Sequence, residues 1–115
     1  MKTLMMSLAL IGLGACASAP ISPDRLEHAE DSIRGAEEIG ALNVPAAKLH
    51  LQLAKDQTDT AKKMAAQGDE RAILVMARAE SDAELALGLA REVSVHSDAV
   101  KAAEDLKAVR ARGNP

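Results

Sequence analysis

The chain contains no Phe, Tyr or Trp among its 115 residues. Its core must therefore be assembled from Leu, Ile, Val, Met and a great deal of Ala. Helices that pack through alanine approach each other closely, but each alanine buries little apolar area. We therefore expect a thin core and marginal stability for the isolated chain, offset by self-association or by a membrane partner.

Apolar residues recur at intervals of three and four, which is the period of amphipathic helices. A first helix is expected after Ser22, because this serine can cap it, Pro23 suits the first helical position and Asp24 favours the positive end of the helix dipole. Gly40 and residues 41–45 should end this helix. Its apolar positions are Leu26, Ala29, Ile33 and Ala36.

A second helix is expected to open at Pro45 and to carry two neighbouring apolar stripes. The second helix is expected to end with Gly68 as a left-handed cap, and Asp69 is expected to be the N-cap of the next helix. The first stripe is Ala46, Leu49, Leu53, Thr60 and Met64, and the second is Ala47, Leu51, Ala54, Thr58, Ala61 and Ala65.

A third helix is expected from Glu70, with a heptad-like seam built mostly of alanine. The segment Ser94–Asp98 contains poor helix formers, so a break there and a continuous helix are both compatible with the sequence. The seam is Ala72, Met76, Ala79, Ala83, Ala86, Ala90 and Val93, and Val100, Ala103, Leu106 and Val109 are expected to continue its period.

These patterns predict an all-α fold, because no run of residues alternates as a strand would. The arrangement we expect is an antiparallel three-helix bundle over residues 22–112, with a third helix that is long or split and a frayed tail at 113–115. Tetratricopeptide-like hairpins are a second arrangement, although the sequence has no 34-residue period.

The N-terminus has the order of an export signal, with Lys2 followed by an apolar stretch from Leu4 to Leu13. This stretch is shorter than the roughly 20 apolar residues that span a bilayer. The run Leu13-Gly14-Ala15-Cys16 resembles the lipobox of bacterial lipoproteins. The resemblance implies cleavage between Ala15 and Cys16, removal of residues 1–15, a diacylglyceryl group on the thiol, and an N-acyl chain such as palmitate.

Ordinary signal cleavage after Ala17 or Ala19 is the competing prediction, although Pro20 fits poorly beside a scissile bond. Cys16 is the only cysteine, and an unpaired thiol in an oxidising compartment favours lipidation. In a two-membrane bacterium, the absence of an aspartate after the cysteine implies the periplasmic face of the outer membrane. Residues 16–21 would then form a lipidated tether.

The composition argues against several classes of function. The net charge is −3 and no basic cluster is present, which disfavours nucleic-acid binding. The three histidines, His28, His50 and His96, lack the spacing of metal ligands, and we expect them to be exposed or capping. No phosphate loop, serine elbow or cysteine nucleophile is present. The sequence therefore predicts no cofactor, no metal and no enzyme activity.

The numerous carboxylates are expected to lie on a solvated face with partners one helical turn away. The expected pairs are Glu30 with Arg34, Asp59 with Lys63, and Arg78 with Asp82.

Several further positions resemble the bacterial lipoprotein family called domain of unknown function 4398. The resemblance spans residues 22–93 and implies an envelope lipoprotein, but it brings no activity and no catalytic residue. The positions are Ala29-Glu30, Ala36, Ala41, Pro45, Leu49, Ala54-Lys55, Gln67-Gly68-Asp69, Ala72, Ala79, Ala83 and Ala86.

Three functions compete at this point. The first is a membrane-anchored helical module that binds a protein partner or another copy of itself, because the seam of the third helix is too long for the other two helices to cover. The second is a structural role that links or spaces the outer membrane and the cell wall. The third is a carrier of a small apolar ligand, which the lack of large side chains disfavours.

Overall fold

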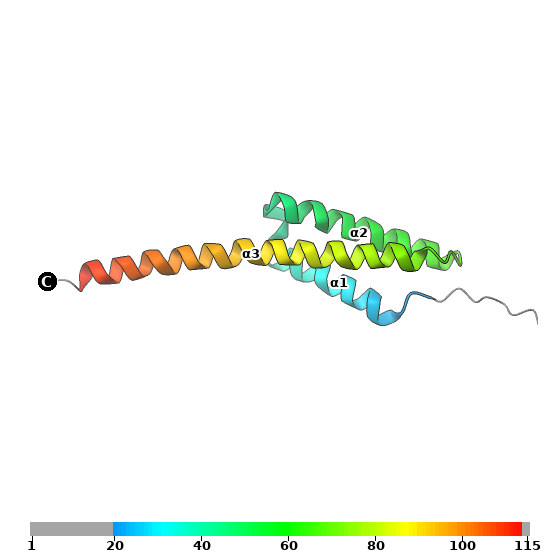
Figure 1. Ribbon diagram of the computed structural model, residues 1–115, viewed down its shortest axis with the longest axis horizontal. Coiled ribbons are helices and arrows are strands. Elements are labelled where there is room, and N and C mark those ends of the chain that lie inside the picture. The colour runs from blue at the N-terminus through cyan, green and yellow to red at the C-terminus, as the bar shows by residue number, and fades with distance from the viewer. Residues whose placement is uncertain (1–19, 114–115) are drawn as a thin grey trace, which may run out of the picture.

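The computed structural model describes residues 20–113 and contains four helical elements. They are α1 (Pro23–Glu38), the short 3-10 helix η1 (Ala41–Asn43), α2 (Pro45–Ala66) and α3 (Ala72–Arg112), and the described part of the chain has no strand (Figure 1). The predicted all-α fold and three-helix bundle are confirmed.

The start of α1 follows the expected capping chemistry. The Ser22 hydroxyl and the Ser22 carbonyl both accept from the backbone N–H of Arg25, and Pro23 takes the first helical position. At the other end, Gly40 has φ +89°, a left-handed conformation that turns the chain into η1. Val44 is extended before Pro45, as the residue preceding a proline must be, and α2 then begins.

The turn between α2 and α3 is built around Gly68, which has φ +74°. The Asp69 carboxylate accepts from the backbone N–H of Arg71 at 2.9 Å and also pairs with the Arg71 guanidinium. These bonds lower the pKa of Asp69 to about 2. The expected start of α3 at Glu70 is wrong by two residues, because Asp69 closes a turn with Arg71 and α3 begins at Ala72.

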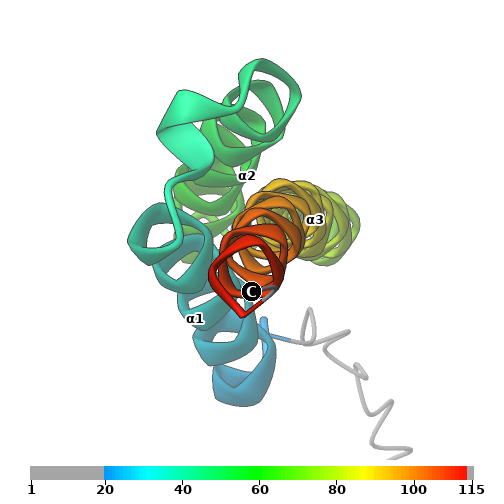
Figure 2. The same ribbon diagram turned by 90° about the vertical axis from the view of Figure 1, so that its left-hand side faces the viewer.

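Successive helices run antiparallel, so α1 and α3 point the same way (Figure 1). Viewed along the bundle, α1 and α2 lie on one side of α3 (Figure 2). One face of α3 is therefore covered by its neighbours, and the opposite face is open along the whole helix.

Alanine forms most of the core, and Leu51 and Met76 are its largest fully buried side chains. The covered face of α3 is completely buried and matches the predicted seam as far as its sixth position. It consists of Ala72, Met76, Ala79, Ala83, Ala86 and Ala90.

Only one of the two stripes predicted for α2 enters the core. Leu51, Ala54 and Thr58 of the second stripe are buried, and the Thr58 hydroxyl donates to the Ala54 carbonyl. Leu49 of the first stripe is 59% exposed, because the bundle has no fourth helix to cover that side.

The helix α3 continues without a break through Ser94–Asp98. Of the two alternatives left open by the sequence, the continuous helix is therefore correct. Backbone hydrogen bonding along a 41-residue helix outweighs the weak propensity of five residues.

Most of the ion pairs join two different helices. Glu30 pairs with Lys62 of α2 instead of Arg34, and Arg34 pairs with Asp31. Arg25 of α1 makes a two-pronged contact with Glu80 of α3, with Nε–Oε1 and Nη2–Oε2 distances of 2.9 and 2.6 Å. The contact raises the pKa of Arg25.

We expect Glu80→Gln to lower the free energy of unfolding by about 1 kcal/mol, because it removes the anion from a half-buried pair while keeping the volume. The control is Glu27→Gln, which removes a carboxylate at an exposed position of α1. Urea denaturation of both variants gives the difference. Equal unfolding midpoints for the two variants would show that the pair contributes nothing to stability.

Candidate interaction surface

The outstanding feature of the molecule is the distal half of α3, residues 91–112, which projects beyond the bundle (Figure 1). Every residue from 91 to 113 is exposed. At 1.5 Å per residue this segment adds about 33 Å of unsupported helix. Five large apolar side chains on it are between 45 and 67% exposed: Val93, Val95, Val100, Leu106 and Val109.

The geometry follows from helix lengths. The covering helix α2 has 22 residues and α1 has 16, whereas α3 has 41. The C-terminal end of α1 and the N-terminal end of α2 lie near Ala90, the last buried residue of α3, which clusters with Ala36 and Ala47. Val93, which the sequence placed on the seam, lies just beyond them near Ile39 and Val44 and is half exposed.

Along the distal half, the expected continuation of the seam is only partly correct. A continuous α-helix turns by about 100° per residue, so each step of three is about 60° short of a full turn and the line from Val100 to Val109 crosses about half of the helix circumference. Leu106 and Val109 consequently lie on another side of α3. Apolar residues spaced four and three apart form a different line there, which we call the outer stripe: Val95, Ala99, Ala102, Leu106 and Val109.

The outer stripe was not predicted from the sequence, although its apolar residues recur there at intervals of four and three. Extended backwards with the same spacing, it passes through Glu92, Gly88 and Leu85, all exposed. Leu85 is two residues from Ala83, or about 200° around the helix, so this line lies opposite the covered face.

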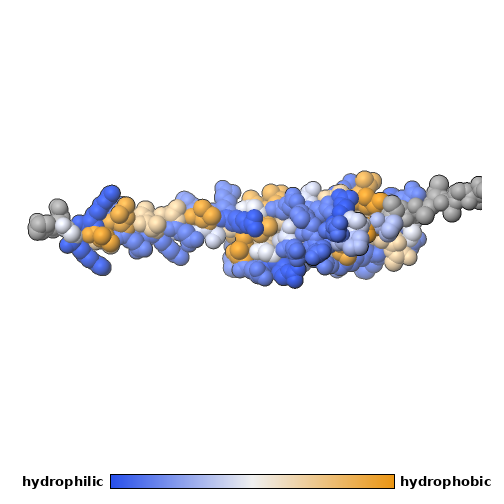
Figure 3. Space-filling view, turned by 90° about the horizontal axis from the view of Figure 1, so that it is seen from below, coloured by the Kyte–Doolittle hydropathy of each residue, from blue (hydrophilic) through white to orange (hydrophobic). Residues whose placement is uncertain are grey.

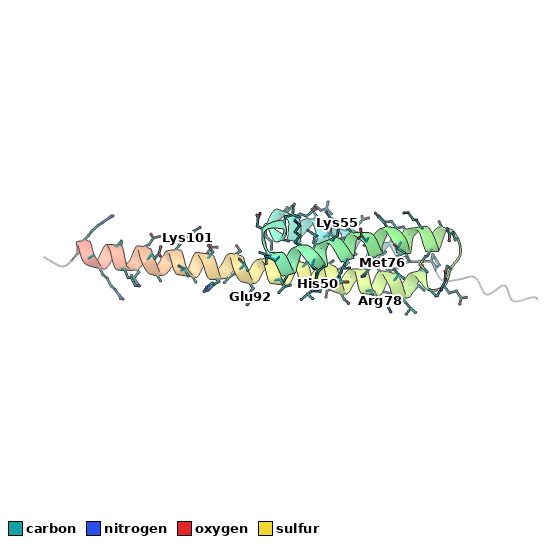
Figure 4. The ribbon with its side chains drawn as sticks, turned by 90° about the horizontal axis from the view of Figure 1, so that it is seen from above. His50, Lys55, Met76, Arg78, Glu92 and Lys101 are labelled. Carbon is teal, nitrogen blue, oxygen red and sulfur yellow. The ribbon has the colours of Figure 1, made fainter. Side chains whose placement is uncertain are left out.

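The surface of the distal half mixes apolar and charged patches, and orange patches alternate with blue ones along it (Figure 3). Glu92 lies where α3 leaves the bundle, and Lys101 lies farther along the projecting part (Figure 4). Near Glu92 the side of α3 is an open, shallow surface formed by α3 alone, along Gly88, Arg91, Glu92, Val95, His96 and Ala99.

The three histidines occupy separate places. His50 is not exposed as predicted, because it is half-buried between α2 and α3 with its Nδ1 2.7 Å from Asp82 Oδ1. Gln57 donates to the other oxygen of Asp82 at 2.9 Å. The Asp82 carboxylate therefore bonds to two side chains of α2 and not to Arg78, its predicted partner. His28 is exposed, 3.7 Å from Glu84, and His96 is exposed on the distal half.

Other kinds of site find little support in residues 20–113. No group of three His, Cys, Asp or Glu side chains there could hold a metal ion. A cavity of about 130 Å³ beside Pro20 and Met76 is smaller than the usual ligand pocket. Within the same residues, none of the helices is both long and apolar enough to cross a membrane.

The predicted lipidation and cleavage residues, Ala15 and Cys16, lie outside the described residues. The last residues of the predicted tether do reach the bundle, where Ile21 packs against the cluster of Ala29, Ala61, Met76 and Ala79. Pro20, the first described residue, therefore lies near the start of α3, at the end of the bundle farthest from the distal half (Figure 1).

Comparison with known proteins returned no matching family model, no matching curated protein and no matching solved structure. The resemblance to the lipoprotein family remains an expectation from the sequence.

Proposed function

We propose that this chain is a lipid-anchored envelope protein that acts as a non-catalytic helical interaction module. Its anchor is the lipidated Cys16, its bundle is a support, and its binding element is the distal half of α3. The observation that carries the proposal is the complete exposure of residues 91–113 on a helix that continues unbroken from the bundle.

An uncovered helix of this length needs an explanation. Isolated helices of about 20 residues are marginal in water, and packing usually supplies most of a helix's stability. Exposed valine and leucine side chains on it add an apolar surface that favours association. A protein partner that packs along the distal half would stabilise the helix and bury its exposed apolar side chains.

The location follows from the lipobox resemblance and from where the two ends lie. Residue 20 enters the bundle at one end, and α3 leaves at the other. A lipid on Cys16 would hold the first end at the periplasmic face of the outer membrane. The distal half of α3 would then point into the periplasm.

A structural role between outer membrane and cell wall is the second candidate. The observation in its favour is the basic tip of α3, where Arg110 and Arg112 lie in the last turn. This tip could meet the carboxylates of the cell wall.

The test is crosslinking in intact cells with the full-length chain and with a chain that ends at Glu92. We expect the shorter chain to keep the melting temperature of the bundle within a few degrees, because every residue from 93 to 113 is exposed. We also expect it to lose the discrete crosslinked proteins that the full-length chain captures.

Equal capture by both chains would contradict the proposal, since the distal half would then be dispensable. Capture of cell-wall fragments alone, lost on truncation, would favour the structural role.

A further inference from the structure

The outer stripe has the pattern of a two-stranded coiled coil. With Ala99 and Leu106 at heptad position a, the d positions are Val95, Ala102 and Val109. All five are exposed, and three of them are large apolar side chains that no other element covers. One heptad towards the bundle, Gly88 has no side chain and nothing lies within 4 Å of the place where a Cβ would be, so a second helix can approach closely there.

The stripe is also accessible to another chain. It lies opposite the face that α1 and α2 cover, so a helix laid along it does not meet the bundle of its own molecule (Figure 2). Two copies can therefore pair through their stripes while both bundles stay on the outside.

The charges beside the stripe match a second copy in parallel orientation. In a parallel, in-register pair the g residue of one helix faces the e residue five positions later on the other. Asp105 then faces Arg110 of the second copy, twice by symmetry, and Glu92 at position a lies beside Arg91 of the second copy. Asp98 faces Ala103. Glu92 faces its own counterpart, because residues at position a meet each other in a parallel pair, and the two Arg91 side chains beside them offset this repulsion.

Antiparallel pairing places like charges together. In one of its two registers Asp98 faces Asp105 and Arg91 faces Arg112. In the other, Asp105 faces itself across the axis, although Asp98 faces Arg112 twice. Like charges at these positions are unfavourable. Parallel pairing also leaves both N-terminal ends on one side, as two anchors in one membrane require.

We infer that the outer stripe binds the outer stripe of a second copy of this chain, forming a parallel two-stranded coiled coil beyond the two bundles. The inference rests on the proposed function and names its partner. Alanine at two of the five positions makes the seam narrow and its intrinsic affinity modest. Attachment to one membrane raises the effective concentration of the two copies and favours their pairing.

The test is disulfide crosslinking of the full-length, membrane-attached chain in an oxidising envelope. Val95→Cys and Val109→Cys place a thiol at two d positions that meet their own counterparts only in the parallel pair. The matched control is Ala108→Cys, an exposed position about a third of a turn away from the midline of the stripe. The parent chain controls for Cys16.

We expect disulfide-linked homodimers from both stripe variants and at least about tenfold fewer from Ala108→Cys. Adding Leu106→Asp to Val95→Cys should reduce the dimer at least about tenfold, because a buried leucine contributes more than one decade of association constant. Val100→Asp, an equally exposed site off the stripe, should leave it unchanged.

Several outcomes would overturn the inference. These are dimer yields from Val95→Cys and Val109→Cys that do not exceed the control, or disulfides from Val95→Cys to a different protein only. The second result would leave the interaction module standing while excluding a second copy as its partner. The melting temperature of the bundle in the Leu106→Asp variant should match the parent, since Leu106 lies outside the bundle.

Discussion

Replacing Ala83 with glutamate should unfold the bundle. Ala83 is fully buried on the covered face of α3, between the two helices that lie against it. A glutamate there adds four heavy atoms to a close-packed site and leaves a carboxylate without a partner. An unpaired buried charge costs about 3–5 kcal/mol, which is comparable with the whole stability of a small domain.

The matched control is Ala108→Glu, which adds the same side chain to the same helix at an exposed position. Its melting temperature should stay within a few degrees of the parent. Thermal melts followed by circular dichroism compare the two variants. If Ala83→Glu melted like Ala108→Glu, the alanine seam would not be the contact that holds α3 to the bundle.

Replacing Cys16 with alanine should release the protein from the membrane while leaving its fold intact. If Cys16 carries three acyl chains, each buried methylene contributes about 0.8 kcal/mol to membrane attachment, and their sum makes the attachment effectively permanent. Without the thiol no such chains can be added. We expect an uncleaved precursor or a soluble species, with a bundle that melts as in the parent because Cys16 precedes all of its helices.

The measurement is membrane fractionation together with the intact mass of the mature chain. Ser18→Ala, a neighbouring change that keeps the thiol, is the control and should stay with the outer membrane. A Cys16→Ala protein that still sediments with the outer membrane would contradict the lipobox prediction. A parent protein that begins at Ser18 or Pro20 would instead indicate ordinary signal cleavage.

Much of the fold is visible in the sequence because it depends on local chemistry. Ser22, Pro23 and Pro45 specify helix starts through capping and fixed backbone angles, and Gly40 and Gly68 adopt the positive φ values that end helices. The alanine seam of α3 follows from spacing alone. The start of α3 differs from the prediction, because an aspartate can accept from backbone N–H groups either as a helix N-cap or within a turn. Asp69 accepts from the Arg71 N–H in a turn, and α3 begins after it.

The partners of individual side chains were less predictable. Glu30, Asp82 and His50 have plausible partners on their own helices, but they bond to residues of other helices in the folded chain. Sequence spacing describes neighbours one turn away, whereas the approach of α1, α2 and α3 brings together residues about 30 positions apart.

The sequence by itself determined the helices, their order and the seam through which α3 enters the core, because capping and period are properties of short segments. Only the tertiary structure decided how far that seam is covered. The bundle ends near Ala90, where α1 ends and α2 begins, and the continuous helix α3 extends beyond them. Which face of α3 stays open, and hence where the outer stripe lies, depends on both covering helices packing on the same side.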